Sequence, residues 1–205
     1  DYVTELLGEL MKYVDDKGYE KLNARFLDWP SSENPKGIDA GLQALMAIAF
    51  DSGAKLETIW GNTELAKKCS DISAKMKKCR RDFNGSKQAA SLNAIAGMIS
   101  PEKAAKKTIL PGGAKDFSTF YGYYMLEALA LAGCYTEAMD IMSQYWGAML
   151  DLGATTFWED FNLDWTKNAA RIDELVPEGK VDIHSSYGNY CYKGFRHSLC
   201  HGWAS

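Results

Sequence analysis

The sequence predicts an all-α fold, on two observations. Apolar residues recur at helical spacing along several stretches, and no stretch alternates between apolar and polar residues as a strand would. The breaks between these stretches are rich in Gly, Asn, Ser and Pro, which end and begin helices. Helices joined by such short breaks pack as antiparallel hairpins, so we expect helical hairpins in succession.

The first half of the chain contains one helix and one hairpin. Helical spacing over residues 3–14 predicts an amphipathic helix, which Asp15, Asp16 and Gly18 end. A polar loop with two prolines follows. A long helix is then expected over residues 38–60, and Gly61-Asn62 breaks it before Thr63 caps a partner helix. The partner buries residues at helical spacing: Leu65, Cys69, Ile72, Met76 and Cys79.

The second half repeats this pattern. A short helix is expected over residues 91–99, and Ser100-Pro101 marks the start of another. A strongly apolar helix over residues 117–132 ends at Gly133, and Thr136 caps a helix that runs to about residue 150. The following 154–195 stretch is a loop whose length suggests a functional role, and a final helix begins near Ser198.

Composition excludes several classes of function. With 46% hydrophobic residues the chain can bury a core, and its net charge of −4 comes without the basic stripe of a nucleic-acid binder. The Lys- and Arg-rich 67–81 stretch is interpreted as a solvated helix face. No apolar run is long enough to cross a membrane. The five cysteines form no even framework, so buried free thiols are expected.

The loop after the last long helix carries the best catalytic candidate. Glu159 lies between Trp158 and Asp160, just beyond the helix end at Gly153. An indole and a second carboxylate beside it would raise the pKa of Glu159, as general acid–base catalysis requires. The alternative, a surface Glu near a core Trp, is favoured when only the chemistry of these residues is considered.

Two further loops carry candidate binding residues. Asp28 and Trp29 precede Pro30, either as a buried turn anchor or as a sugar-stacking platform with a carboxylate for hydroxyl groups. His197 and His201 would share a helix face, but their spacing with the cysteines matches no familiar zinc pattern. We therefore expect no metal, and His201 is either a core histidine or a hydroxyl partner.

Together these loops resemble the α-L-rhamnosidases of glycoside hydrolase family 78. The segment 153–159, Gly-Ala-Thr-Thr-Phe-Trp-Glu, is similar to the family's catalytic-base motif and follows a similar Trp-Gly-x-Met-Leu stretch at 146–150. The segment 198–201 is similar to the family's Ser-Leu-Asn-His, and 26–29 to its Phe-Gly-Asp-Trp. The three occur in the family's order, and the resemblance extends along nearly the whole chain.

The resemblance implies part of an (α/α)6 barrel and an inverting hydrolase of α-L-rhamnosides that needs no cofactor. Glu159 would be the general base, Trp29 would pack on the sugar together with Asp28 and Trp158, and His201 would hold a hydroxyl group. The partners implied are a rhamnose-containing glycoside and the remainder of the parent polypeptide. An exported enzyme, periplasmic or secreted, would fit this substrate.

The sequence also departs from the family. The family's upstream Asp-Cys-Pro-x-Arg-x-Glu-like motif, which holds the general acid, does not occur, and Leu27 and Cys200 replace Gly and Asn. We therefore expect residues 1–205 to be a fragment of one catalytic domain that lacks the N-terminal hairpins and the last hairpin. Three alternatives stay open: a glycosidase for another sugar, a non-catalytic carbohydrate-binding toroid, and a helical interaction scaffold.

Overall fold

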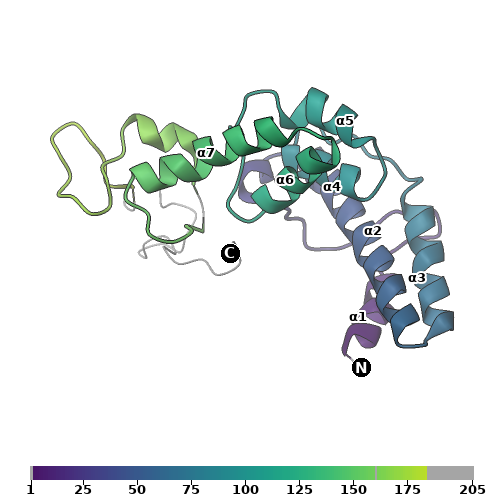
Figure 1. Ribbon diagram of the computed structural model, residues 1–205. Coiled ribbons are helices and arrows are strands. Elements are labelled where there is room, and N and C mark those ends of the chain that lie inside the picture. The colour runs from purple at the N-terminus through teal and green to yellow at the C-terminus, as the bar shows by residue number, and fades with distance from the viewer. Residues whose placement is uncertain (1, 160, 184–205) are drawn as a thin grey trace.

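The computed structural model describes residues 2–159 and 161–183, and over these residues the protein is all-helical. The β-type pairing in this part consists of two isolated bridges, Val14 with Glu20 and Ala169 with Val181. Helices α1, α2 and α3 form one end of an elongated arrangement and α7 extends to the other, with α4, α5 and α6 between them (Figure 1). The predicted all-α class is confirmed.

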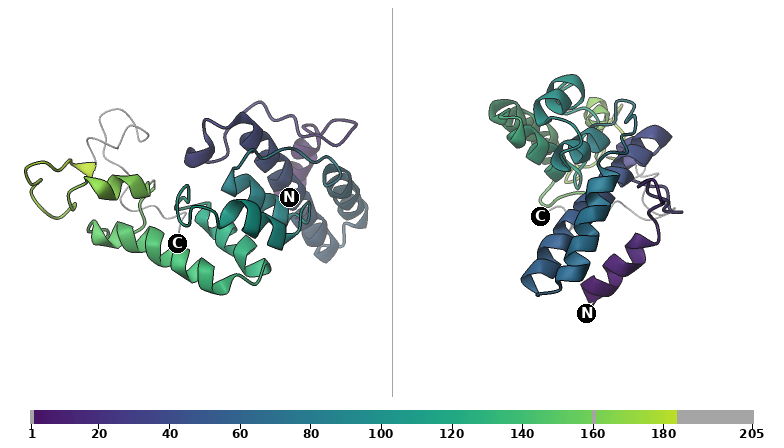
Figure 2. Two further views of the ribbon diagram at one scale, coloured as in Figure 1. Left: turned by 90° about the horizontal axis from the view of Figure 1, so that it is seen from above. Right: turned by 90° about the vertical axis from the view of Figure 1, so that its right-hand side faces the viewer.

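The first hairpin is confirmed with small shifts of its ends. After α1 (Tyr2–Met11), which ends before the predicted residue 14, α2 (Pro35–Ile59) and α3 (Thr63–Met76) run side by side (Figure 2). Helix α2 begins at Pro35 because the Asn34 side chain accepts a hydrogen bond of 3.0 Å from the Gly37 amide. Asn62, and not the predicted Thr63, caps α3 in the same way, since its side chain accepts a hydrogen bond from the Leu65 amide.

The middle of the chain forms short helices. Helix α4 (Lys87–Ile95) begins four residues before the predicted start, because Ser86 Oγ caps it by accepting the Ala89 amide at 3.1 Å. Helix α5 (Pro101–Ala104) has the predicted Ser100 cap and continues into a π-helical turn, η2 (Ala105–Ile109). The predicted start at residue 91 is therefore wrong. Because α4 begins at Lys87, the polar residues Lys87 and Gln88 lie in its first turn, where both are buried.

The second hairpin consists of α6 (Gly122–Leu131) and α7 (Tyr135–Asp151). Two details of its prediction are wrong. Residues 117–121 precede α6 instead of forming its first turn, with a turn at 119–121. Cys134, not Thr136, precedes α7 and provides no side-chain cap. Gly133 ends the first helix as predicted, with a φ of 73° that a residue with a β-carbon rarely adopts.

The long C-terminal loop contains one short helix in its described part. The 3-10 helix η3 (Leu163–Lys167) is capped by Asn162, which accepts the Asp164 amide at 2.9 Å. A similar single turn, η1 (Trp29–Ser31), interrupts the polar loop before α2. The helix expected near Ser198 lies outside the described residues.

Buried apolar residues form two clusters. The smaller cluster joins α1, α2 and α3 around Phe50 and Met76, and the larger joins α2, α4, α6, α7 and the loop after α7 around Phe117, Tyr145 and Trp158. Helix α2 contributes to both. Cys69 and Cys79 are buried free thiols, as expected. None of the described helices combines the length and apolar character needed to cross a bilayer.

Candidate functional site

A cleft of about 320 Å³ lies where two of the three candidate loops meet. Its lining comes from the turn at residues 29–33, the loop at 114–117, Tyr145 on α7 and the segment 161–165. The first of these belongs to the Asp28-Trp29 loop and the last continues the loop that carries Glu159. The tertiary structure therefore brings together segments that are more than 120 residues apart in the sequence.

Aromatic rings form much of the cleft wall. Trp29 is half-buried and contacts Phe26 edge to face, with ring centroids 5.0 Å apart. Elsewhere in the lining Phe161 contacts Tyr145 at 5.4 Å and Trp165 at 5.9 Å, also edge to face. The Tyr145 hydroxyl donates a 2.7 Å hydrogen bond to the Phe161 carbonyl, which fixes the loop after α7 onto that helix. Phe161 and Tyr145 are each 1% exposed, so they support the wall from behind, whereas the half-buried Trp29 ring can offer a stacking surface to a sugar.

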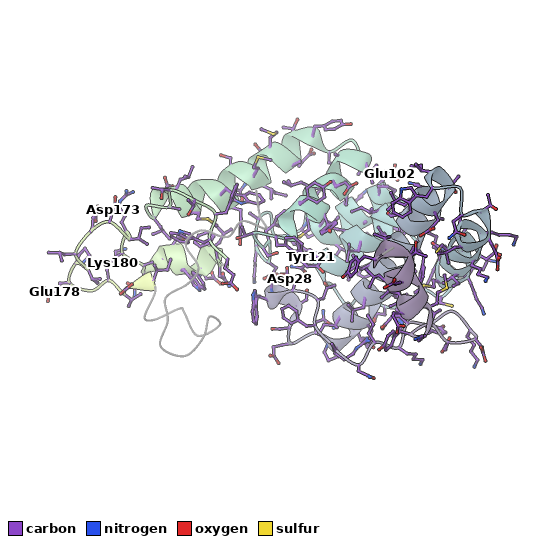
Figure 3. All side chains as sticks on the ribbon, turned by 90° about the horizontal axis from the view of Figure 1, so that it is seen from below. Asp28, Glu102, Tyr121, Asp173, Glu178 and Lys180 are labelled. Carbon is purple, nitrogen blue, oxygen red and sulfur yellow. The ribbon has the colours of Figure 1, made fainter. Side chains whose placement is uncertain are left out.

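Asp28 lies behind this wall rather than in the cleft. It is buried, and its Oδ2 accepts hydrogen bonds from Ser118 Oγ at 2.6 Å and Gln88 Nε2 at 3.0 Å. Tyr121 lies near it (Figure 3). Burial first, and the negative charge of Asp28 second, raise the pKa of Tyr121 well above its ordinary range. These contacts favour the turn-anchor interpretation of Asp28 over a direct grip on sugar hydroxyls.

Trp158 also lies in the core. Only 1% of its surface is exposed, and its ring contacts Phe161 edge to face at 5.8 Å. Its Nε1 atom has no hydrogen-bond partner within the described residues. A ring buried in this way supports the loop from below and presents no face on which a sugar can stack.

Glu159 is half-buried and lies two residues before Phe161 in the sequence, but it is not among the residues that line the cleft. The charged side chains that do line the cleft are both acidic, Glu33 and Asp116. The positive φ of 62° at Asp116 is uncommon outside glycine, although Asp tolerates it better than most residues. The cleft is thus an acidic, aromatic-lined surface.

The third candidate loop cannot be placed against this cleft. His197 and His201 lie outside the described residues, as do Cys191 and Cys200. In the part of the chain that the structure describes, no group of three His, Cys, Asp or Glu side chains is arranged to hold a metal ion.

Sequence reasoning missed the residues beneath the cleft, in the first turn of α4. Lys87 is buried, donates a 2.6 Å hydrogen bond to the Gly113 carbonyl and lies 5.4 Å from the centre of the Phe117 ring. Burial lowers the pKa of Lys87 to about 8, partly offset by the charge of Asp116. The polar pair Lys87-Gln88 directly after a capping Ser was the available signal, but placing the helix start at residue 91 hid it.

No protein-family model matches the sequence, and no curated protein is significantly similar to it. Among solved structures, a rhamnosidase of glycoside hydrolase family 78 from Bacillus sp. GL1 matches with a TM-score of 0.63 and 19% sequence identity. The match covers 98% of this chain and 22% of that enzyme, so the chain spans about a fifth of the enzyme's length. At this identity the likeness shows the fold, and it agrees with the predicted part of an (α/α)6 barrel.

Proposed function

We propose that this chain is part of an inverting glycoside hydrolase that acts on α-L-rhamnosides, with Glu159 as the general base. The observation that carries the proposal is the cleft where the Trp29 and Glu159 loops meet in a wall of aromatic rings. The fold shared with a family 78 rhamnosidase supports it. The remainder of the parent polypeptide would complete the catalytic domain.

In the proposed reaction Glu159 removes a proton from water as the water oxygen bonds to the anomeric carbon. The bond from this carbon to the leaving oxygen breaks on the opposite face, and a carboxylic acid outside this chain protonates the leaving oxygen. The transition state resembles an oxocarbenium ion. Trp29 would pack on the sugar and His201 would hold a hydroxyl group. Asp28 and Trp158, both buried, would support these loops.

The test is Glu159→Gln in the parent enzyme, assayed on an aryl α-L-rhamnoside. Loss of the base should lower kcat by roughly 10²–10⁴-fold while KM changes little. Proton NMR of the first product formed by the unmodified enzyme should show the inverted anomer. Glu137→Gln, an exposed glutamate in the first turn of α7, is the matched control and should keep full activity. Near-normal turnover by Glu159→Gln would reject the role.

A second candidate function is carbohydrate binding without catalysis. It is favoured by one observation, that Glu159 is not among the residues that line the cleft. A parent protein of this kind should bind rhamnosides but hydrolyse none of a panel of glycosides. Trp29→Ala should then weaken binding of L-rhamnose, whereas Glu159→Gln should leave it unchanged. Hydrolysis of a glycoside of another sugar would instead keep the catalytic interpretation and change its specificity.

A further inference from the structure

Gln88, in the first turn of α4, makes hydrogen bonds with every part of its amide group. Its side chain is 1% exposed. Its Nε2 donates to Asp28 Oδ2 and to the Asp116 carbonyl, both at 3.0 Å. Its Oε1 accepts from Ser31 Oγ at 2.8 Å and from Ser86 Oγ at 3.3 Å. An amide side chain has two N–H groups to donate and two oxygen lone pairs to accept with, so no polar part is left over.

Three of these four partners belong to the two walls of the cleft, and the fourth, Ser86, is the N-cap residue of α4. Asp28 and Ser31 flank Trp29 in the turn that forms one wall, and Asp116 lies in the loop that forms the other. A direct hydrogen bond also joins the two walls, since Ser118 Oγ donates to the same Asp28 oxygen at 2.6 Å. Gln88 therefore contacts both walls at once from a rigid helix behind them.

We propose that Gln88 is the positioning residue of the cleft, holding the Trp29 turn and the 113–118 loop at a fixed separation. The proposal deepens the proposed function by naming the residue that holds the same site in shape. Its consequence for sugar binding rests on the proposed function. Buried hydrogen bonds hold geometry well because an unpaired partner is costly. Gln88 acts through Trp29 and the facing loop, without touching the substrate.

The first test needs no ligand. Amide hydrogen exchange of the 205-residue chain is compared with that of Gln88→Met, which keeps the volume and removes the amide. We expect faster exchange in residues 28–33 and 113–118, and unchanged exchange in α2 and α3. Unchanged exchange at both walls, or an equal rise throughout the chain, would overturn the proposal.

Gln43 provides the matched control. It is also a fully buried glutamine, and its amide bonds the Gly18 and Met76 carbonyls and the Glu20 amide, on the α3 side of the molecule. Gln43→Met should loosen the 15–22 loop and leave the cleft walls protected. An equal effect of both variants on the cleft walls would show that Gln88 contributes general stability only, and would also overturn the proposal.

A charge swap tests the tie to Asp28 directly and guards against a variant that fails to fold. Gln88→Glu places two carboxylates together, and should loosen residues 28–33 more than Gln88→Met does. Adding Asp28→Asn restores an amide–carboxylate hydrogen bond in the reverse direction, so protection of residues 28–33 should return. Residues 113–116 should stay looser, because the introduced carboxylate has no N–H for the Asp116 carbonyl. A double variant no better protected than Gln88→Glu would refute the tie.

A binding measurement links this tie to the proposed function. NMR titration with L-rhamnose should show affinity at least several-fold lower for Gln88→Glu and recovery in the double variant. If the unmodified chain binds no L-rhamnose, the choice of sugar fails while the exchange measurements still decide the role of Gln88. If it binds and Gln88→Glu binds equally well despite loosened walls, the link between wall separation and binding is refuted.

Discussion

At the scale of single residues, the buried charges are each held by specific partners. Glu20 is 1% exposed and accepts two hydrogen bonds from Arg25 Nη1, at 2.7 and 2.9 Å. Arg25 and Arg81 both also pair with Asp39 on α2, which joins the 15–25 loop to the first hairpin. Lys87 differs, because its nearest partners are a carbonyl and a ring rather than a carboxylate. Burial therefore destabilises the charged, protonated form of Lys87 relative to its neutral form.

The lowered pKa of Lys87 predicts how stability changes with pH. Its pKa is about 8 in the folded chain and 10.5 in the unfolded chain, so between these values the unfolded chain binds more protons. Stability therefore rises as pH rises through this window, by about 3 kcal/mol at most. Urea unfolding at pH 7.5 and pH 9.5 should show this rise, and Lys87→Met should abolish it. The exposed Lys106→Met should keep the rise, and an equal rise in Lys87→Met would contradict the assignment.

At the scale of elements, close approach between segments depends on small residues in α2. A β-carbon added to Gly41 would overlap the side chain of buried Leu27, reaching within 2.9 Å of Cδ1. Leu27, which stands where the resembled motif has Gly, thus packs into the space that Gly41 leaves. This contact sets the loop that carries Asp28 and Trp29 onto α2.

Gly41→Ala should therefore destabilise the chain by about 1–3 kcal/mol, because the added methyl group overpacks this contact. Leu27→Ala in the same chain should recover part of the loss. Gly147→Ala is the control, since a β-carbon there would meet nothing within 4 Å in the helix α7. That change should be neutral or stabilise by up to about 1 kcal/mol through helix propensity. Thermal unfolding followed by circular dichroism measures all three, and equal effects of the two alanines would refute the packing argument.

At the scale of the whole molecule, α2 joins the two apolar clusters. Near its start it packs into the larger cluster through Ile38 and Leu42, and around its middle it packs into the smaller through Met46 and Phe50. Because α2 is one continuous helix of 25 residues, unfolding of one cluster removes a helix on which the other cluster packs. Cooperative unfolding of both clusters follows from this coupling.

We expect a single unfolding transition, with circular dichroism and tryptophan fluorescence giving the same midpoint. Phe50→Ala in the smaller cluster should cost about 3–5 kcal/mol and lower both midpoints together. Fluorescence reports the larger cluster in particular, because Trp158 and Trp165 lie there. Two separate transitions in Phe50→Ala, with fluorescence unchanged at the first, would show that α2 does not couple the clusters.

The sequence by itself determined the fold class and most helix ends. Helical spacing marks which face is buried, and capping residues such as Ser100 and terminators such as Gly133 act within one turn of the helix, so both are readable locally. It missed the starts of α4 and α6. The Ser86 cap starts α4 four residues before the predicted residue 91. Residues 117–121, of which Phe117, Phe120 and Tyr121 are aromatic, precede α6 despite their apolar character.

The candidate site was decided mainly by tertiary structure. The sequence identified Trp29 and the Glu159 loop, but only the packing of α4 against both loops shows that Asp28 turns inward to Gln88 and Ser118. Sequence spacing carries no information on partners 60 and 90 residues apart. Burial and hydrogen-bond geometry arise only once the hairpins pack, and so the residues that hold the cleft could be found only in the folded chain.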